Sequence, residues 1–106
     1  MQQPTLASRR LRAALVSRRA DVDEVLERYG AGNLRMFGSA ARGDAGDESD
    51  LDLLVDLAPS SGNELLRIAG LSEELSDLLG VRVDVVARTL LRAEVSATVI
   101  DDAVAV

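Results

Sequence analysis

The sequence predicts a small α/β (α+β) domain, in which a mixed three-stranded sheet is flanked by helices. Stretches with the three-to-four-residue spacing of amphipathic helices lie before, between and after three short apolar runs. The chain has 106 residues, enough for one domain with one modest core. Hydrophobic residues make up 47% of it, which argues against general disorder. We therefore expect residues 1–106 to form a single domain.

The first helix is expected over residues 5–29. Residues spaced three or four apart form one face of this helix, and only Arg18 interrupts its apolar character. The series is Leu11, Leu15, Arg18, Val22, Val25 and Tyr29. The helix is expected to kink or restart between Ser17 and Asp21, where Asp21 can cap a second segment. Gly30 is a suitable end because glycine readily adopts the left-handed conformation found there.

Three strands are expected after this helix, over Leu34–Phe37, Leu51–Leu57 and Val81–Val86. The second strand is almost wholly apolar after Asp52, which indicates a central strand buried on both faces. A helix between the second and third strands predicts a right-handed parallel crossover.

The intervening helix is expected to begin at a capping box, Ser61-Gly62-Asn63-Glu64, and to end at Leu79. Its apolar face combines Leu65, Ile68, Leu71 or Ser72, Leu75 and Leu78 or Leu79, and Gly70 is expected to permit close packing on the sheet. A last helix is expected to be capped by Thr89 and to present Leu91, Val95 and Val99. Residues 101–106 are expected to fray.

The composition limits the chemistry. The chain has no cysteine, no histidine and no lysine, so thiolate or histidine zinc sites and a lysine nucleophile are excluded. Acid–base or metal chemistry must then rest on aspartate and glutamate, which favour hard cations such as Mg²⁺ or Mn²⁺. The sequence contains no apolar run of membrane-spanning length and no secretory signal pattern, so a cytoplasmic location is expected.

Charge is divided unevenly along the chain. Residues 1–42 carry a net charge of +4, and residues 43–106 carry −10. The acidic half argues against a broad nucleic-acid surface. The basic cluster comprises Arg9, Arg10, Arg12, Arg18 and Arg19, and it indicates either a solvated helix face or a contact with RNA or an acidic partner.

Two carboxylates lie at the start of the second strand. Alternate residues of a strand share a face, so Asp50 and Asp52 point the same way. Two carboxylates held this close repel unless a cation lies between them. Asp84 interrupts a run of valines in the third strand, where a lone acid is costly to bury. If the third strand lies beside the second, these three aspartates form a cluster able to hold two metal ions during phosphoryl transfer.

A glycine–serine turn precedes the acids. Gly38 allows a sharp turn and a close approach to phosphate without a Cβ. The backbone N–H groups and hydroxyl of Ser39 favour an anion. Arg42 is expected either to contact a phosphate or to pair with an acid of the loop.

These motifs resemble the DNA polymerase beta nucleotidyltransferase superfamily. They are Gly38-Ser39-Ala40-Ala41-Arg42-Gly43, then Ser49-Asp50-Leu51-Asp52, and a later Asp84. Within it the chain is most similar to minimal nucleotidyltransferases, which implies the polymerase beta-like fold. The resemblance implies triphosphate binding by Gly38 and Ser39, with Arg42 and Ser49 nearby. It also implies ligation of Mg²⁺ by Asp50, Asp52 and Asp84, Asp84 helping to activate the acceptor hydroxyl.

The resemblance further implies a reaction and a partner. AMP would move from ATP to a hydroxyl with release of pyrophosphate, typically to a tyrosine of a HEPN-type RNase toxin that the protein neutralises as an antitoxin. Two alternatives remain: a non-catalytic antitoxin that acts by covering its toxin, and a transferase that acts on RNA ends or a small hydroxyl compound. We expect Asp56 to be a solvated strand end and Tyr29 to lie in the core.

Overall fold

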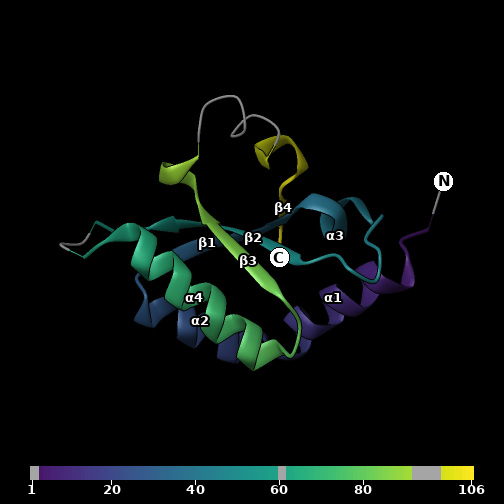
Figure 1. Ribbon diagram of the computed structural model, residues 1–106, viewed down its shortest axis with the longest axis horizontal. Helices are drawn as coiled ribbons and strands as arrows, with labels where there is room; N and C mark the ends of the chain where they lie inside the picture. The colour runs from purple at the N-terminus through teal and green to yellow at the C-terminus, as the bar shows by residue number, and fades with distance from the viewer. Residues whose placement is uncertain (1–2, 60–61, 92–98) are drawn as a thin grey trace.

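The computed structural model describes residues 3–59, 62–91 and 99–106, which form helices on both sides of a sheet (Figure 1). The elements in chain order are α1 (Leu6–Ser17), α2 (Arg19–Arg28), β1 (Ala31–Phe37), α3 (Gly38–Arg42), β2 (Leu51–Leu57), α4 (Glu64–Leu79), β3 (Val83–Ala87), the 3₁₀ helix η1 (Arg88–Leu90) and β4 (Val104–Ala105).

The sheet has four strands in the order β3-β2-β1-β4. β1 pairs antiparallel with β2 and β4, and β2 pairs parallel with β3. The mixed sheet and the parallel pairing of the second and third strands are thus confirmed. The expected count of three strands was wrong, because the residues expected to fray include β4. Two residues are too few to show an alternating pattern in the sequence.

The predicted break in the first helix is confirmed. Thr5 caps α1 by accepting a hydrogen bond from the Ser8 N–H, and α1 ends before Arg18. Asp21 does not cap α2. Its carboxylate instead lies 2.9 Å from Arg18 Nε, in an exposed ion pair within the first turn of α2.

Helix α4 departs from the expected capping and burial. Its cap is Asn63, whose side chain accepts a hydrogen bond from the Leu66 N–H, and not Ser61, which lies outside the described residues. Leu71 and Leu75 are fully buried as expected, but Leu65 is 66% exposed. Gly70 packs against the ring of Tyr29, not against the sheet, since a Cβ at Gly70 would lie 3.0 Å from the phenol oxygen.

The last helix was only partly predicted. Thr89 lies inside η1 and donates a hydrogen bond to Glu64 Oε2 instead of capping a longer helix. Val95 lies outside the described residues. Val99 belongs to a helical segment over residues 99–102 and is buried.

The sheet has two unlike faces. On one face, here called the core face, Leu51, Leu53 and Val55 are fully buried. Helices α1, α2 and α4 lie on this side of the strands, and α3, η1 and residues 99–102 lie on the other (Figure 1). The other face, here called the aspartate face, carries Asp52 and Asp56 of β2, with Asp84 of β3 beside them. Alternation along β2 therefore places the acidic side chains on the face opposite Leu51, Leu53 and Val55, although Leu54, which is also fully buried, shares the face of the acids.

The outer edge of β3 is closed by α4. The backbone N–H groups of Val83 and Val85 donate to the hydroxyls of Ser76 and Ser72 at 2.9 and 3.1 Å. Serines one helical turn apart thus satisfy donors that an edge strand would otherwise expose. The parallel pair β2–β3 is held in place by this contact, and with it the acids that the pair carries.

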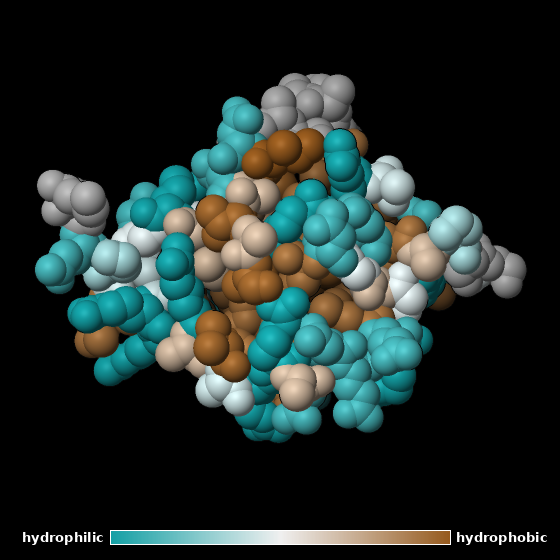
Figure 2. Space-filling model, turned by 180° about the vertical axis from the view of Figure 1, so that it is seen from behind, coloured by the Kyte–Doolittle hydropathy of each residue, from teal (hydrophilic) through white to brown (hydrophobic). Residues whose placement is uncertain are grey.

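Some apolar surface remains exposed. Figure 2 shows apolar side chains gathered in the middle of the face seen from behind. The large hydrophobic residues that stay exposed include Leu65 and Leu66 in α4, Ile100, and Val104 and Val106 at the C-terminal end. Among the described residues, no helix has the length and apolar character needed to cross a membrane.

Candidate active site

The parallel pairing of β2 with β3 places Asp52 beside Asp84. The two residues are direct partners in the register, between the pairs Leu51–Val83 and Leu53–Val85. Neighbouring residues at one level of a sheet project to the same face. The predicted approach of the third acid to the second is therefore confirmed.

Gly38 brings the glycine–serine turn against Asp52. The register pairs Phe37 with Asp52, so the chain turns into α3 directly beside this acid. Gly38 has φ +70°, and a Cβ built there would collide with the Asp52 carboxylate. Glycine is required both by the backbone conformation and by the space. The close approach expected for a phosphate is made, in this structure, by a carboxylate of the protein.

The N-terminal segment holds α3 in this place. Arg12 of α1 donates hydrogen bonds to the carbonyls of Ala40 and Ala41, at 3.3 and 3.0 Å. Thr5 donates its N–H to Gly43 O, and the buried Ser8 hydroxyl accepts from the Ala45 N–H. These bonds satisfy backbone groups at the end of α3 and in the following loop. The turn beside Asp52 is thereby fixed to the body of the domain.

Asp50 pairs with a residue that the sequence reading did not single out, Arg82. Arg82 Nε lies 3.0 Å from Asp50 Oδ1. This oxygen is buried and makes no hydrogen bond of acceptable geometry. The pairing follows from the strand register, because the Asp52–Asp84 pair, extended back by two residues, places Asp50 opposite Arg82. Sequence analysis could have found this partner by fixing the register first.

The three carboxylates interact electrostatically. Partial burial, followed by the charges of Asp84 and Asp50, raises the pKa of Asp52 to about 6, against a smaller lowering by Arg42. Partial burial and the charge of Asp50 raise the pKa of Asp84. A raised carboxylate pKa means that the folded protein disfavours the charged form. A cation bound among these groups would relieve that cost.

The residues fit a hard divalent cation in kind, since all three donors are carboxylates and two of them are electrostatically strained. They are not fully assembled for it. Among the described residues, no three histidine, cysteine, aspartate or glutamate side chains lie close enough together to hold a metal ion. The expected three-carboxylate cluster is thus present as one registered pair with Asp50 nearby, not as a closed set of ligands.

The other predicted site residues have different surroundings. Ser39 is half-buried, and its side chain makes no hydrogen bond with any described residue. Arg42 lies 3.3 Å from Asp44 and 2.8 Å from Asp102, so it pairs with a loop acid, one of its two expected roles. The Ser49 hydroxyl accepts a hydrogen bond from the Gly46 N–H and stabilises the loop before β2.

Asp56 is not simply a solvated strand end. It accepts hydrogen bonds from Asn33 and Arg35, which lower its pKa, the Asn33 bond contributing most. Asn33 has φ +50° and lies where the register between β1 and β2 shifts. Asp56 therefore fixes an irregular part of β1 and is separate from the three-aspartate group.

Two hollows on the described part of the surface do not coincide with the aspartates. One cavity of about 240 Å³ is lined by Arg10, Ser49 and Arg82, among others, and borders the loop that leads to Asp50. Another of about 440 Å³ is lined by Tyr29, Ala58 and Arg67. Neither is lined by Asp52 or Asp84. We assign the site from the registered acids and the adjoining turn, because cavity size by itself indicates no chemistry.

Comparison with known proteins agrees with this site. A family model described as a nucleotidyltransferase domain matches residues 21–106. The protein adenylyltransferase MntA of Thermococcus cleftensis is 40% identical over 81 residues, which are 76% of this chain and 80% of that protein. A candidate protein adenylyltransferase of Methanocaldococcus jannaschii is 35% identical over 66 residues, covering 62% of this chain and 65% of that protein.

Two solved structures have the same fold. One, described as a candidate minimal nucleotidyltransferase, has a TM-score of 0.71 and 42% identity, covering 87% of this chain and 92% of that chain. The other, described as a toxin–antitoxin with AMP-PNP, has a TM-score of 0.67 and 20% identity, covering 81% and 69%. The latter shows likeness of fold alone. With the family model and the first structure in agreement, this chain belongs to the nucleotidyltransferase family and, within it, to the minimal nucleotidyltransferases.

Proposed function

We propose that this minimal nucleotidyltransferase is the antitoxin of a toxin–antitoxin pair and transfers AMP from ATP to a hydroxyl of its toxin, with Mg²⁺ as cofactor. The observation that carries the proposal is the placement of Asp52 between Asp84 and the Gly38–Ser39 turn. Supporting it, the relatives that match are named protein adenylyltransferases. The acceptor that we favour is a tyrosine of a HEPN-type toxin.

In the proposed reaction, the acceptor oxygen forms a bond with the α-phosphorus of ATP. The bond from that phosphorus to the β-phosphate bridging oxygen breaks, and pyrophosphate leaves with the electron pair. Asp84 accepts the hydroxyl proton, because it lies beside Asp52 and remains accessible to solvent despite its partial burial. Ser39 offers an unengaged hydroxyl to the triphosphate, and Arg42 can turn from Asp102 toward it. Divalent ions held by Asp50, Asp52 and Asp84 would neutralise charge on the reacting phosphates.

A partner protein can supply the acceptor hydroxyl and cover the exposed apolar surface. The described residues leave large hydrophobic side chains exposed, among them Leu65, Leu66 and Ile100. Exposed apolar surface is typical of a site that another protein covers. We expect the toxin to bring the acceptor hydroxyl to the aspartate face and to bury part of this surface.

The test is label transfer. The protein is incubated with Mg²⁺ and the toxin encoded by its neighbouring gene, with ATP labelled at either the α- or the γ-phosphate. We expect label from the α-phosphate alone on the toxin, and a loss of about 10²-fold or more in Asp50→Ala and Asp52→Ala. Asp56→Ala is the matched control on the same strand face and should retain transfer. Transfer that survives both site substitutions would overturn the catalytic assignment.

One observation favours the non-catalytic antitoxin as a second candidate. The described residues hold no assembled three-ligand metal site, and Asp50 is engaged by Arg82. If neutralisation works by binding alone, Asp50→Asn and Asp52→Asn proteins will still inhibit the toxin's RNase activity without transferring label. The catalytic proposal requires that both substitutions abolish lasting neutralisation.

A further inference from the structure

Arg82 contacts the buried half of the Asp50 carboxylate. The Asp50 side chain is 41% exposed, yet its Oδ1 atom is buried and lies 3.0 Å from Arg82 Nε. The exposed part of the carboxylate must therefore include Oδ2. An ion arriving from solvent would meet Oδ2, while Oδ1 stays against the guanidinium. The two oxygens of Asp50 thus have separate surroundings, one protein-bound and one open.

The same guanidinium also fixes the loop that carries Asp50. Arg82 Nη2 donates a 2.6 Å hydrogen bond to the Glu48 carbonyl, and the Arg82 carbonyl accepts from the Leu51 N–H at 2.8 Å. The loop is thereby tied to the start of β3 on both sides of Asp50. The planar guanidinium thus combines a hydrogen bond to the Glu48 carbonyl with an ion pair to Asp50, an arrangement that a lysine ammonium does not reproduce.

We propose that Arg82 is a positioning residue for metal binding, which holds Asp50 by Oδ1 so that Oδ2 is presented toward Asp52 and Asp84. This inference rests on the proposed metal-dependent function. Partners that orient a metal-ligating side chain typically contribute 10–100-fold to metal affinity. A simple charge argument predicts the opposite sign, because removal of a cation beside an acidic site should tighten metal binding. The sign of the effect therefore separates the two accounts.

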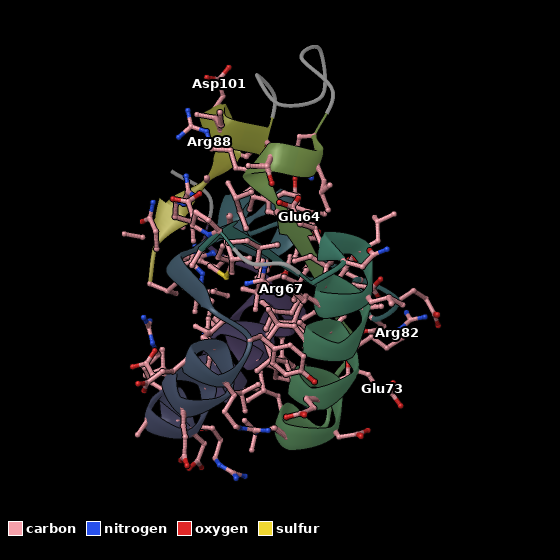
Figure 3. The ribbon with its side chains drawn as sticks, turned by 90° about the vertical axis from the view of Figure 1, so that its left-hand side faces the viewer. Glu64, Arg67, Glu73, Arg82, Arg88 and Asp101 are labelled. Carbon is pink, nitrogen blue, oxygen red and sulfur yellow. The ribbon has the colours of Figure 1, made fainter. Side chains whose placement is uncertain are left out.

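Arg88 supplies a matched control. Arg82 and Arg88 bracket β3 and lie at opposite ends of the strand (Figure 3). Both side chains are exposed. Arg88→Gln removes the same charge from the opposite end of β3, where no contact with Asp50 is made. If only the charge matters, Arg82→Gln and Arg88→Gln will shift metal affinity in the same direction.

The experiment is titration of the full chain with Mn²⁺, with free ion measured by electron paramagnetic resonance. We expect Arg82→Gln to weaken binding about tenfold, Arg82→Lys to restore part of it, and Arg88→Gln to change it less than about twofold. In an Asp50→Asn background, Arg82→Gln should have no further effect, which shows that Arg82 acts through Asp50. Circular dichroism of each variant checks that the fold is retained.

The outcomes are distinct. Unchanged or tighter Mn²⁺ binding by Arg82→Gln overturns the positioning role, even if Asp52→Asn abolishes binding and so leaves the proposed function standing. An equal loss from Arg82→Gln in the Asp50→Asn background also overturns it, because the effect then does not pass through Asp50. If the unmodified protein binds no Mn²⁺, the metal-dependent function fails as well.

Discussion

The two faces of the central strand β2 differ in the side chains that they carry and in what burial does to each. On the core face, Leu51, Leu53 and Val55 are fully buried and pack into the cluster formed with α1, α2 and α4. On the aspartate face, the same strand carries Asp52, whose charged form is disfavoured by burial and by neighbouring acids. Apolar burial on the core face lowers the free energy of folding, whereas the charge of Asp52 raises it in the absence of a cation. Such a contrast is typical of a site selected for binding or catalysis.

The largest effect on stability is expected on the core face. Leu53→Ala removes a fully buried side chain from a central strand, and such changes cost about 2–5 kcal/mol through lost burial and the cavity left behind. Urea unfolding followed by circular dichroism measures the change. A loss below about 1 kcal/mol would contradict our assignment of β2 as the centre of the core.

A smaller loss of stability is expected at the turn between the faces. Gly38→Ala places a side chain at φ +70° and against the Asp52 carboxylate, for a cost of about 1–3 kcal/mol. It should also reduce label transfer, since the turn or Asp52 must move. Gly46→Ala is the control in the loop that follows, where a Cβ meets no atom within 4 Å. Equal behaviour of the two variants would remove the special role of Gly38.

The smallest expected effect is an increase in stability, on removal of the Asp52 charge. The pKa of Asp52 is raised to about 6 in the folded protein, from 3.8, by burial and then by Asp84 and Asp50. A carboxyl group with a raised folded pKa binds its proton more tightly when folded, so its contribution to stability falls as pH rises from about 4 to 6. Without metal, Asp52→Asn should therefore raise stability at pH 7.5, by about 1 kcal/mol after allowance for solvent screening.

The same substitution should change little at pH 4, where the folded protein already holds Asp52 protonated. Thermal unfolding of both proteins in a chelating agent, at the two pH values, measures the difference. A destabilised Asp52→Asn protein at pH 7.5 would show that this carboxylate supports the fold, contrary to the contrast between the two faces.

Much of this architecture was predictable because it depends on local pattern. The apolar run Leu51–Leu57 predicted both ends of β2 correctly. The spacing of Asp50 and Asp52 predicted that their side chains point to the same face. Pairing between distant segments was harder to predict. β4 is only two residues long, and its place beside β1 is set by tertiary contact. The same holds for Arg42 and Asp102, which are sixty positions apart and meet in an ion pair.

The candidate site likewise contains residues that the sequence predicted and one residue that it did not. Gly38, Asp52 and Asp84 could be named from residue type and spacing, and the register brings them together. Arg82 was missed because arginine at a strand start usually faces solvent, and its partner is visible only when β2 and β3 are aligned. The sequence also could not predict that Asp50, Asp52 and Asp84 fall short of a complete three-ligand metal site among the described residues, because this depends on how their side chains pair.

The most direct test of the central claim is a crystal structure of the protein with Mn²⁺ and a non-hydrolysable ATP analogue, with Mn²⁺ located by anomalous scattering. Our account predicts a peak bound by Asp52 and Asp50 on the aspartate face, with the triphosphate against Gly38 and Ser39. An analogue bound elsewhere, for example in the cavity lined by Tyr29 and Arg67, with no Mn²⁺ at Asp52, would contradict it.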